Sequence, residues 1–353
     1  MSIETAKEQA LELLKALIAT PRTSRNEQAA ANLVEESMIS HGYIPERTGN
    51  NLLCKSHYYD PARPALLLNS HIDTVKPVAT WTRDPFQPVI EDGRLYGLGS
   101  NDAGASLVSL LHTFYLADRQ PNNLNMIFLA TCQEEVSGAD GMKMMAPVLP
   151  DISVALIGEP TGMQPAIAEK GLMVLDLEVH GKSGHAARNE GINAIYRAMD
   201  IMAMFRDYRF EKESALLGPV KMSVTVVNSG TQHNVVPDLC TMTVDVRSNE
   251  CYSNIEIFNA IQARLPEWCT MRARSLNLNS SRIQPEHPLI RRAVEMGLRP
   301  FGSPTLSDQA LLGCPSFKMG PGASSRSHSA DEYICIDELN NAIPLYMSLL
   351  KPE

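Results

Sequence analysis

Histidines and carboxylates follow several of the short apolar runs in this 353-residue sequence. Imidazole nitrogens and carboxylate oxygens suit zinc, and they suit iron–sulfur clusters or copper(I) poorly. The side chains are His71 and Asp73 in LLLNSHID, Asp102 in LYGLGSND, Glu134 and Glu135 in IFLATCQEE, Glu159 in VALIGEP, and His328 in FKMGPGASSRSH. Because one tetrahedral ion cannot use so many carboxylates, the set predicts two metal ions.

A pair of metal ions predicts a definite chemistry. Two ions that share a bridging carboxylate can polarise a scissile carbonyl and hold a hydroxide nucleophile. One acid must then stay off the metals to move protons. The H-x-D spacing places Asp73 where its carboxylate can orient the imidazole of His71. The residue types therefore predict metal-assisted hydrolysis.

Each of these motifs has a plainer interpretation when it is taken alone. Glu134 and Glu135 also fit a solvated helix start, and Glu159 fits a surface turn. GLGSNDAG fits a nucleotide loop, but it departs from GxGxxG, and no convincing Walker lysine motif is present. The GxSxG elbow of serine hydrolases is absent from the sequence. The prediction therefore depends on the joint order of the motifs.

The apolar runs before these side chains predict the elements that position them. They alternate little with polar residues, which is typical of strands buried on both faces of a sheet. The runs are Ala65 to Leu68, Met126 to Ala130, Val154 to Ile157 and Ser316 to Met319. Helical patterns lie between and before them, at Ala103–Ala117 and after apparent capping boxes at Thr5-x-x-Glu8 and Ser24-x-x-Glu27. In such an α/β sheet, ligands gather outside the carboxyl ends of the strands, so we expect the side chains on one rim.

The pattern changes between residues 168 and 281, where half-buried strands alternate apolar and polar residues. Strand and helix patterns there follow the order β-α-β-β-α-β, which predicts a ferredoxin-like α+β unit. Buried strands resume after it. We therefore predict a larger α/β domain formed by residues 1–167 and 282–353, with residues 168–281 inserted as a smaller domain.

Charge and cysteine usage limit the partners and the compartment. Lys and Arg number 31 against 40 Asp and Glu, and no basic run occurs, which argues against nucleic acid or an anionic membrane as partner. No apolar stretch approaches the roughly 20 residues needed to span a bilayer. The stripe of Leu13, Leu14, Leu17 and Ile18 predicts an amphipathic helix rather than a signal peptide. Seven cysteines without a CxxC pair predict reduced thiols in the cytoplasm.

Seven motifs occur in a familiar order over nearly the whole chain. They are HIDTV, YGLGSND, QEEVSG, IGEPT, GHAA, NVVPD, and GPG with SHSADEY. In this order they resemble the metallopeptidase family of acetylornithine deacetylase, succinyl-diaminopimelate desuccinylase and carboxypeptidase G2. The resemblance implies a zinc-hydrolase-like catalytic domain with a mostly parallel sheet, and an inserted domain that acts in dimerisation and as a lid.

The resemblance also implies a ligand set. One Zn²⁺ is expected on His71, Asp102 and Glu159, and a second on Asp102, Glu135 and His328, with Co²⁺ as a possible substitute and Asp102 as the bridge. Glu134 is implied as the general base and Asp73 as the support of the first histidine. His185, in GHAA, resembles a histidine that reaches across a homodimer to the substrate carbonyl. Asn234 and Arg247 resemble polar groups that bind the substrate.

The motifs point to an amide substrate but leave its identity open. HIDTV with SHSADEY is closest to the acetylornithine deacetylase pattern, so the favoured reaction is release of acetate from N-acetylornithine in arginine biosynthesis. N-acetylcitrulline, an N-succinyl amino acid, acetyl-lysine and a dipeptide remain alternatives, and a non-catalytic scaffold is disfavoured because Glu134 is retained. Several positions depart from the commoner family pattern, namely Ser70, Leu98, Ala103 to Ala105 and Lys170. None of these departures removes a proposed metal ligand, but they leave the acyl group and the substrate pocket open.

Overall fold

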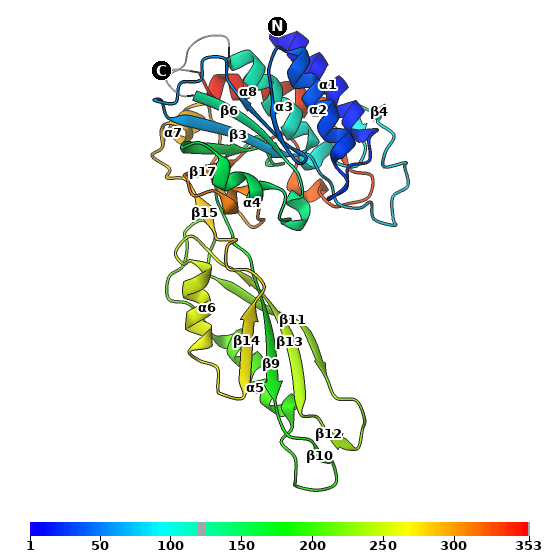
Figure 1. Cartoon of the computed structure of the whole chain (residues 1–353), viewed down its shortest axis with the longest axis vertical. Coiled ribbons are helices and arrows are strands. Elements are labelled where there is room, and N and C mark those ends of the chain that lie inside the picture. Colours follow the sequence, from blue (N-terminus) through cyan, green and yellow to red (C-terminus); the bar gives the residue numbers. More distant parts are fainter. Residues whose placement is uncertain (119–124, 352–353) are drawn as a thin grey trace. The chain divides into compact units, whose positions relative to one another are not determined.

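The computed structural model describes residues 1–118 and 125–351, and its contacts divide the chain into two compact units. Unit 1 comprises Met1–Ile167, Arg282–Phe301 and Ser307–Glu353, and unit 2 comprises Ala168–Ser281 with Gly302–Leu306. Unit 2 is the green-to-yellow part of Figure 1, apart from that last short segment. The main boundaries fall where the sequence pattern changes, whereas the return of Gly302–Leu306 to unit 2 was not predicted.

The main sheet has parallel strands at its centre and antiparallel strands toward its edges. Its strand order is β1-β2-β6-β3-β7-β17-β8-β15, and β16 pairs with β8. Strand β3 runs parallel to β6 and β7, and β7 runs parallel to β17. Strands β1, β2 and β8 join antiparallel to their neighbours. The bounds are β1 Glu46–Thr48, β2 Asn51–Lys55, β3 Ala65–His71, β6 Asn125–Thr131, β7 Ile152–Ile157, β8 Ala166–Glu169, β15 Ser281–Arg282, β16 Phe301–Ser303 and β17 Ser316–Lys318.

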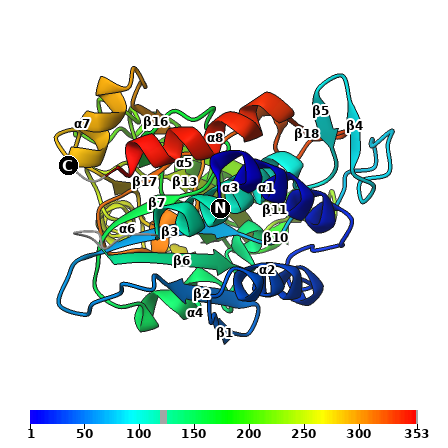
Figure 2. The same cartoon turned by 90° about the horizontal axis from the view of Figure 1, so that it is seen from above.

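Both faces of this sheet are covered, which explains why its strands alternate so little. Leu66 and Leu68 of β3 pack into the core formed with the long helices, while Ala65 and Leu67 pack into the opposite core. The first core includes α1 (Ile3–Ile18), α2 (Gln28–Ser40), α3 (Ala105–Ala117), α7 (Pro288–Glu295) and α8 (Ile336–Leu349). The second includes α4 (Met142–Met145). Figure 1 shows α8 above β3 and β6 and α4 below them, and Figure 2 looks onto the same sheet from the side of the long helices. No helix in the described ranges is long and apolar enough to cross a membrane.

Both predicted capping boxes were wrong. Helix α1 begins earlier than predicted, because the side chain of Ser2 accepts a hydrogen bond from the N–H of Thr5. Helix α2 begins at Gln28, with Glu27 as its N-cap residue but without a side-chain cap bond. The hydroxyl of Ser24 donates instead to a carboxylate of the candidate site, described below. A local sequence motif could not reveal this contact, which joins residues 49 positions apart.

A small antiparallel sheet lies beside the loop that carries Asp102. Its order is β18-β5-β4, with β4 at Val89–Glu91, β5 at Arg94–Tyr96 and β18 at Tyr333–Cys335. Residues 97–104 follow β5, and helix α3 begins two residues later than predicted because Asp102 and Ala103 take non-helical backbone angles. The pairing of β18 with β5 therefore brings the segment after His328 beside the loop that carries Asp102.

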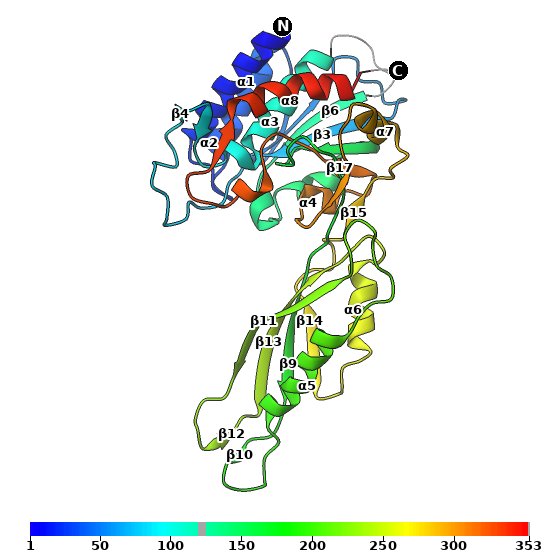
Figure 3. The same ribbon diagram turned by 180° about the vertical axis from the view of Figure 1, so that it is seen from behind.

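Unit 2 has the predicted ferredoxin-like order. The elements are β9 (Met173–His180), α5 (Ala194–Asp207), β11 (Lys221–Ser229), β13 (Leu239–Arg247), α6 (Asn254–Gln262) and β14 (Cys269–Ala273). The antiparallel sheet has the order β11-β13-β9-β14. Figure 3 shows α5 and α6 with this sheet, and both helices share its apolar core. Two short strands, β10 (Gly184–His185) and β12 (Val235–Val236), pair separately.

Candidate metal centre

The carboxyl ends of the parallel strands deliver the candidate ligands to one place. His71 is the last residue of β3, the 3₁₀ turn Glu134–Val136 follows β6, and Glu159 follows β7. His328 follows β17 after a glycine-containing loop, and Asp102 lies in the turn Ser100–Gly104 that precedes α3. The structure thus brings together the five ligand residues that the sequence predicted.

The two carboxylate oxygens of Asp102 face different histidines. Oδ1 of Asp102 lies 3.3 Å from Nε2 of His71, and Oδ2 lies 3.7 Å from Nε2 of His328. The same nitrogen of His71 is 3.8 Å from Oε1 of Glu159, and that of His328 is 2.9 Å from Oε2 of Glu135. One carboxylate therefore stands between two sets of ligand atoms, as a bridging ligand requires.

Candidate ligand atoms within 4.8 Å of one another form two groups in the described part of the chain. One group is His71, Glu134 and Glu159, and the other is His71, Asp102 and Glu135. Glu134 takes the place of Asp102 in the first group, and His71 takes the place of His328 in the second, so the groups share His71 whereas the predicted sets share Asp102. Nε2 of His328 nevertheless lies 3.7 Å from Oδ2 of Asp102, which keeps His328 a candidate ligand. The position of Glu134 fits either a ligand or a base beside the ligands.

The electrostatics of the cluster suit divalent cations. Burial and the charge of Asp102 raise the pKa of Glu159 to about 8. Burial and the charges of neighbouring acids, Glu159 among them, raise the pKa of Glu134 well above its usual range, despite the opposing effect of His71. Several buried carboxylates this close together repel one another, and cations between them would remove that repulsion. The donor set and its charge therefore fit a metal centre.

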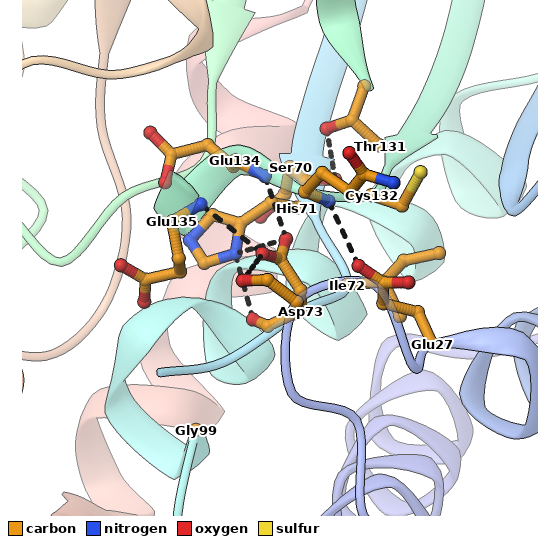
Figure 4. Close-up of polar contacts among 12 residues, drawn as sticks. Glu27, Ser70, His71, Ile72, Asp73, Gly99, Thr131, Cys132, Glu134 and Glu135 are labelled. Carbon is orange, nitrogen blue, oxygen red and sulfur yellow. Dashed lines mark hydrogen bonds and ion pairs between the residues drawn. The ribbon is translucent and has the colours of Figure 1, made fainter. Parts of the chain in front are cut away.

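Asp73 holds the candidate base in place through its carboxylate. Its Oδ1 accepts from the N–H of Glu134 at 3.0 Å, and its Oδ2 accepts from the N–H of Glu135 at 3.2 Å and from the hydroxyl of Ser24 at 2.6 Å. Figure 4 shows the carboxylates of Glu134 and Glu135 pointing away from Asp73. The imidazole of His71 approaches the main-chain oxygen of Asp73 at 3.0 Å and its carboxylate only at 3.6 Å. The sequence placed Asp73 beside His71, but it did not predict that the main-chain oxygen makes the hydrogen bond to the imidazole while the carboxylate orients the turn of Glu134.

A family model and several known proteins match this chain. The model of peptidase family M20/M25/M40 matches residues 67–351. The chain belongs to this family. Acetylornithine deacetylases from Proteus mirabilis and Shigella sonnei are each 28% identical to it, and each alignment covers 92% of this chain and 91% or 92% of the relative. As an M20 protein, the chain is a metal-dependent hydrolase.

Solved structures of M20 peptidases share the whole fold. A tripeptidase from Staphylococcus aureus has a TM-score of 0.78 at 20% identity, with 98% of each chain covered. A dinuclear metal-binding M20 peptidase from Bacillus subtilis has a TM-score of 0.74 at 15% identity, again with 98% of each chain covered. The likeness confirms the predicted α/β catalytic fold with an inserted α+β domain.

The remaining predicted residues of this M20 hydrolase lie in unit 2. His185 is exposed on β10, and its Nδ1 accepts from the N–H of Ala187 at 3.1 Å. The main-chain oxygen of Asn234 accepts from the N–H of Ala186, between β10 and β12. The guanidinium of Arg247 donates to both carboxylate oxygens of Asp245, at 2.9 and 3.1 Å. The roles of His185, Asn234 and Arg247 toward substrate stay predictions.

The metal-free hydrolase is expected to lose stability as the pH rises from about 5 to about 9. The pKa of Glu159 rises from 4.5 to about 8, and the hydrogen bond that the imidazole donates to the carboxylate of Glu135 raises the pKa of His328 from 6.5 to about 9. In both pH windows the folded state holds protons that the unfolded state has released, so increasing pH favours unfolding.

Thermal unfolding of chelator-treated protein across this range measures the effect. Glu159→Gln should make the decline below about pH 8 shallower, since it removes one of the groups whose pKa is raised in the folded state. Saturating Zn²⁺ should raise the thermal unfolding midpoint more at high pH than at low pH, because imidazole and carboxylate groups bind metal in their deprotonated forms. An unfolding midpoint that stays constant or rises with pH would contradict the raised pKa values of Glu159 and His328.

Proposed function

We propose that this M20 hydrolase cleaves the amide of an N-acyl amino acid and that its substrate is N-acetylornithine, in arginine biosynthesis. The observation that carries the proposal is the placement of Asp102 between His71 and His328, with the carboxylate of Glu134 nearby. The choice of acetyl group and ornithine is supported by the two deacetylases that align over 92% of the chain. A biosynthetic substrate of this kind also agrees with the cytoplasmic location predicted from the cysteines.

Other amides are competing substrates, because each also presents a planar amide near a carboxylate. They are N-acetylcitrulline, an N-succinyl amino acid, acetyl-lysine and a dipeptide. The shared fold with the tripeptidase from Staphylococcus aureus favours a peptide as the second candidate. The family pattern does not decide among these substrates, because Ser70, Leu98 and Lys170 depart from its commoner form.

A substrate panel separates these candidates. The protein with added Zn²⁺ or Co²⁺ is incubated with N-acetyl, N-succinyl and N-formyl derivatives of ornithine, citrulline, lysine and diaminopimelate, and with dipeptides. We expect kcat/KM to be highest for N-acetylornithine, by about tenfold or more, because small pocket differences discriminate on that scale. A higher value for another compound would reassign the substrate, and no released amine from any compound would contradict amide hydrolysis.

Five side chains would hold two metal ions, which we propose to be Zn²⁺, with Co²⁺ as a substitute. One ion is assigned to His71, Asp102 and Glu159, and the other to Asp102, Glu135 and His328. When bound, such ions polarise the amide carbonyl and make water acidic enough to lose a proton near neutral pH. Imidazole and carboxylate donors without thiolates agree with zinc.

Glu134 is assigned the proton transfers. One of its carboxylate oxygens takes a proton from the attacking water while the carbon–oxygen bond forms. The same oxygen then gives that proton to the amide nitrogen as the carbon–nitrogen bond breaks. The second proton of the water leaves on the carboxylic acid and passes to the amine, so the products are acetate and the ammonium form of the amino acid. The N–H bond to Asp73 fixes the main chain of Glu134, which keeps the carboxylate within reach of both positions.

His185 is assigned to the developing charge on the substrate oxygen. Because Nδ1 of His185 accepts a hydrogen bond, the neutral ring carries its proton on Nε2, which is then a donor. A donor placed at a developing oxyanion contributes about 10²- to 10³-fold in kcat. His185 lies in unit 2, whereas the proposed metal ligands lie in unit 1. We propose that each His185 serves the metal centre of the other subunit in a homodimer.

Unit 2 carries apolar surface that fits such a homodimer. Strand β11 is at an edge of its sheet, and Val226 and Val227 are 48% and 44% exposed. On the adjacent helix α5, Tyr196 and Met199 are 69% and 57% exposed. An exposed edge strand beside apolar side chains is a liability in a monomer, and pairing of two copies would cover it.

Mixing two inactive variants tests the donation between subunits. His185→Ala and Glu134→Ala are combined under conditions that exchange subunits. Each hybrid dimer then has one site with both groups, so about a quarter of wild-type activity is expected at random pairing. In the control, His185→Ala is mixed with a variant that carries both His185→Ala and Glu134→Ala. This mixture should stay inactive, because neither subunit can supply His185. Proven exchange without recovered activity would contradict donation between subunits.

A further inference from the structure

Glu332 is a buried carboxylate that holds the loop on which Asp102 lies. It is only 2% exposed and comes directly before β18. Its Oε2 accepts from the N–H of Gly99 at 2.9 Å. Its Oε1 accepts from the N–H groups of Asn101 and Asp102, each at 2.8 Å. Three main-chain donors of one short loop therefore converge on a single carboxylate 230 residues or more away in the sequence.

A buried cation holds the same loop from its carbonyl side. The guanidinium of Arg22, which is 1% exposed, donates to the main-chain oxygen of Gly99 at 2.8 Å and to that of Ile72 at 2.9 Å. Gly99 has φ +73°, and a Cβ there would lie 2.4 Å from Nη2 of Arg22. The loop thus runs between a buried carboxylate and a buried guanidinium, and only glycine fits beside the latter.

Asn101 ties this loop to the segment that leads to His328. Its Oδ1 accepts from the N–H of Ala323 at 2.9 Å, and its Nδ2 donates to the oxygen of Ala323 at 3.1 Å and to the hydroxyl of Ser327 at 3.4 Å. A Cβ on Gly322 would lie 2.3 Å from Oδ1 of Asn101, so the contact is close. A shift of the loop would therefore disturb Asp102 and the approach to His328 together.

We propose that Glu332 is a positioning residue that sets where the carboxylate of Asp102 stands between His71 and His328. The inference rests on the proposed function, in which Asp102 bridges two metal ions. The N–H of Asp102 donates to Oε1 of Glu332 at 2.8 Å. The carboxylate oxygens of Asp102 lie 3.3 Å from Nε2 of His71 and 3.7 Å from Nε2 of His328. Loss of Glu332 should weaken both metal positions, since the partners that orient a ligand are typically worth about 10- to 100-fold in metal affinity.

Glu332→Gln is the main test. Its amide oxygen can still accept from Asn101 and Asp102, but its NH₂ group would face the N–H of Gly99, where two donors repel. Glu332→Ala removes all three acceptor contacts and should have the larger effect if it folds. Asp331→Asn is the matched control: Asp331 also accepts three hydrogen bonds, from Thr82 and Arg83, and Asn tolerates its φ of +53°.

Metal affinity is measured directly, by competition with a chromophoric chelator, on proteins whose metal-free unfolding midpoints are also recorded. Glu332→Gln should bind both Zn²⁺ ions about 10-fold or more weakly, with Asp331→Asn close to wild type. Unchanged affinity in Glu332→Gln, or weakening at one position only, would overturn the inference even if the variant is less stable. Wild-type protein that binds no metal would overturn the proposed function as well, whereas two tightly bound ions in wild type and variant alike would overturn this inference alone.

Discussion

Replacing Glu134 with glutamine is expected to lower kcat by about 10²- to 10⁴-fold while both metal ions stay bound. Glutamine keeps the size of the side chain and the main-chain bond to Asp73, but its amide cannot accept the proton from water. Loss of the base should therefore affect turnover far more than KM or metal content.

Glu135→Gln is the matched control, because Glu135 lies on the same turn and is bonded to the same Asp73. It should lose one metal ion as well as activity, since its Oε2 is the partner of His328 at 2.9 Å. Metal analysis beside kinetics separates the two roles. If Glu134→Gln also loses metal, the grouping of Glu134 with His71 and Glu159 marks it as a ligand instead of a base.

Asp102→Ala is expected to empty both metal positions and abolish detectable hydrolysis. The two oxygens of Asp102 face separate histidines, so one substitution removes a ligand from each ion. Glu159→Ala and His328→Ala each remove a ligand from one position only. Calorimetric zinc titration of the three variants compares them. Similar losses of a single ion in all three would contradict the bridge.

The sequence predicted the parts of this fold that depend on local patterns. Apolar runs without alternation marked β3, β6 and β7, because both faces of these strands are covered. Four of the five ligands lie at or after the end of a central strand, so the topology of a parallel sheet brought them to one rim, and Asp102 joins them from the turn before α3. The β-α-β-β-α-β order of unit 2 was likewise predictable, although the bounds of its strands, such as Cys269–Ala273 for β14, come only from the structure.

Hydrogen bonds between distant residues were not predictable in this way. Ser24 was interpreted as a helix cap, yet its hydroxyl donates to Asp73. Glu332 lies in the recognised SHSADEY motif, but only the structure places its carboxylate on the N–H groups of Gly99 and Asp102. Such partners are chosen by tertiary packing, which spacing along the chain does not encode.

Anomalous diffraction at the zinc absorption edge, from crystals grown with Zn²⁺, tests the dinuclear centre most directly. We expect two anomalous peaks that share Asp102, one beside His71 and Glu159 and the other beside Glu135 and His328. The carboxylate of Glu134 should contact neither peak as a ligand. A single peak, or two peaks that do not share Asp102, would contradict the bridged metal centre on which the proposed hydrolysis depends.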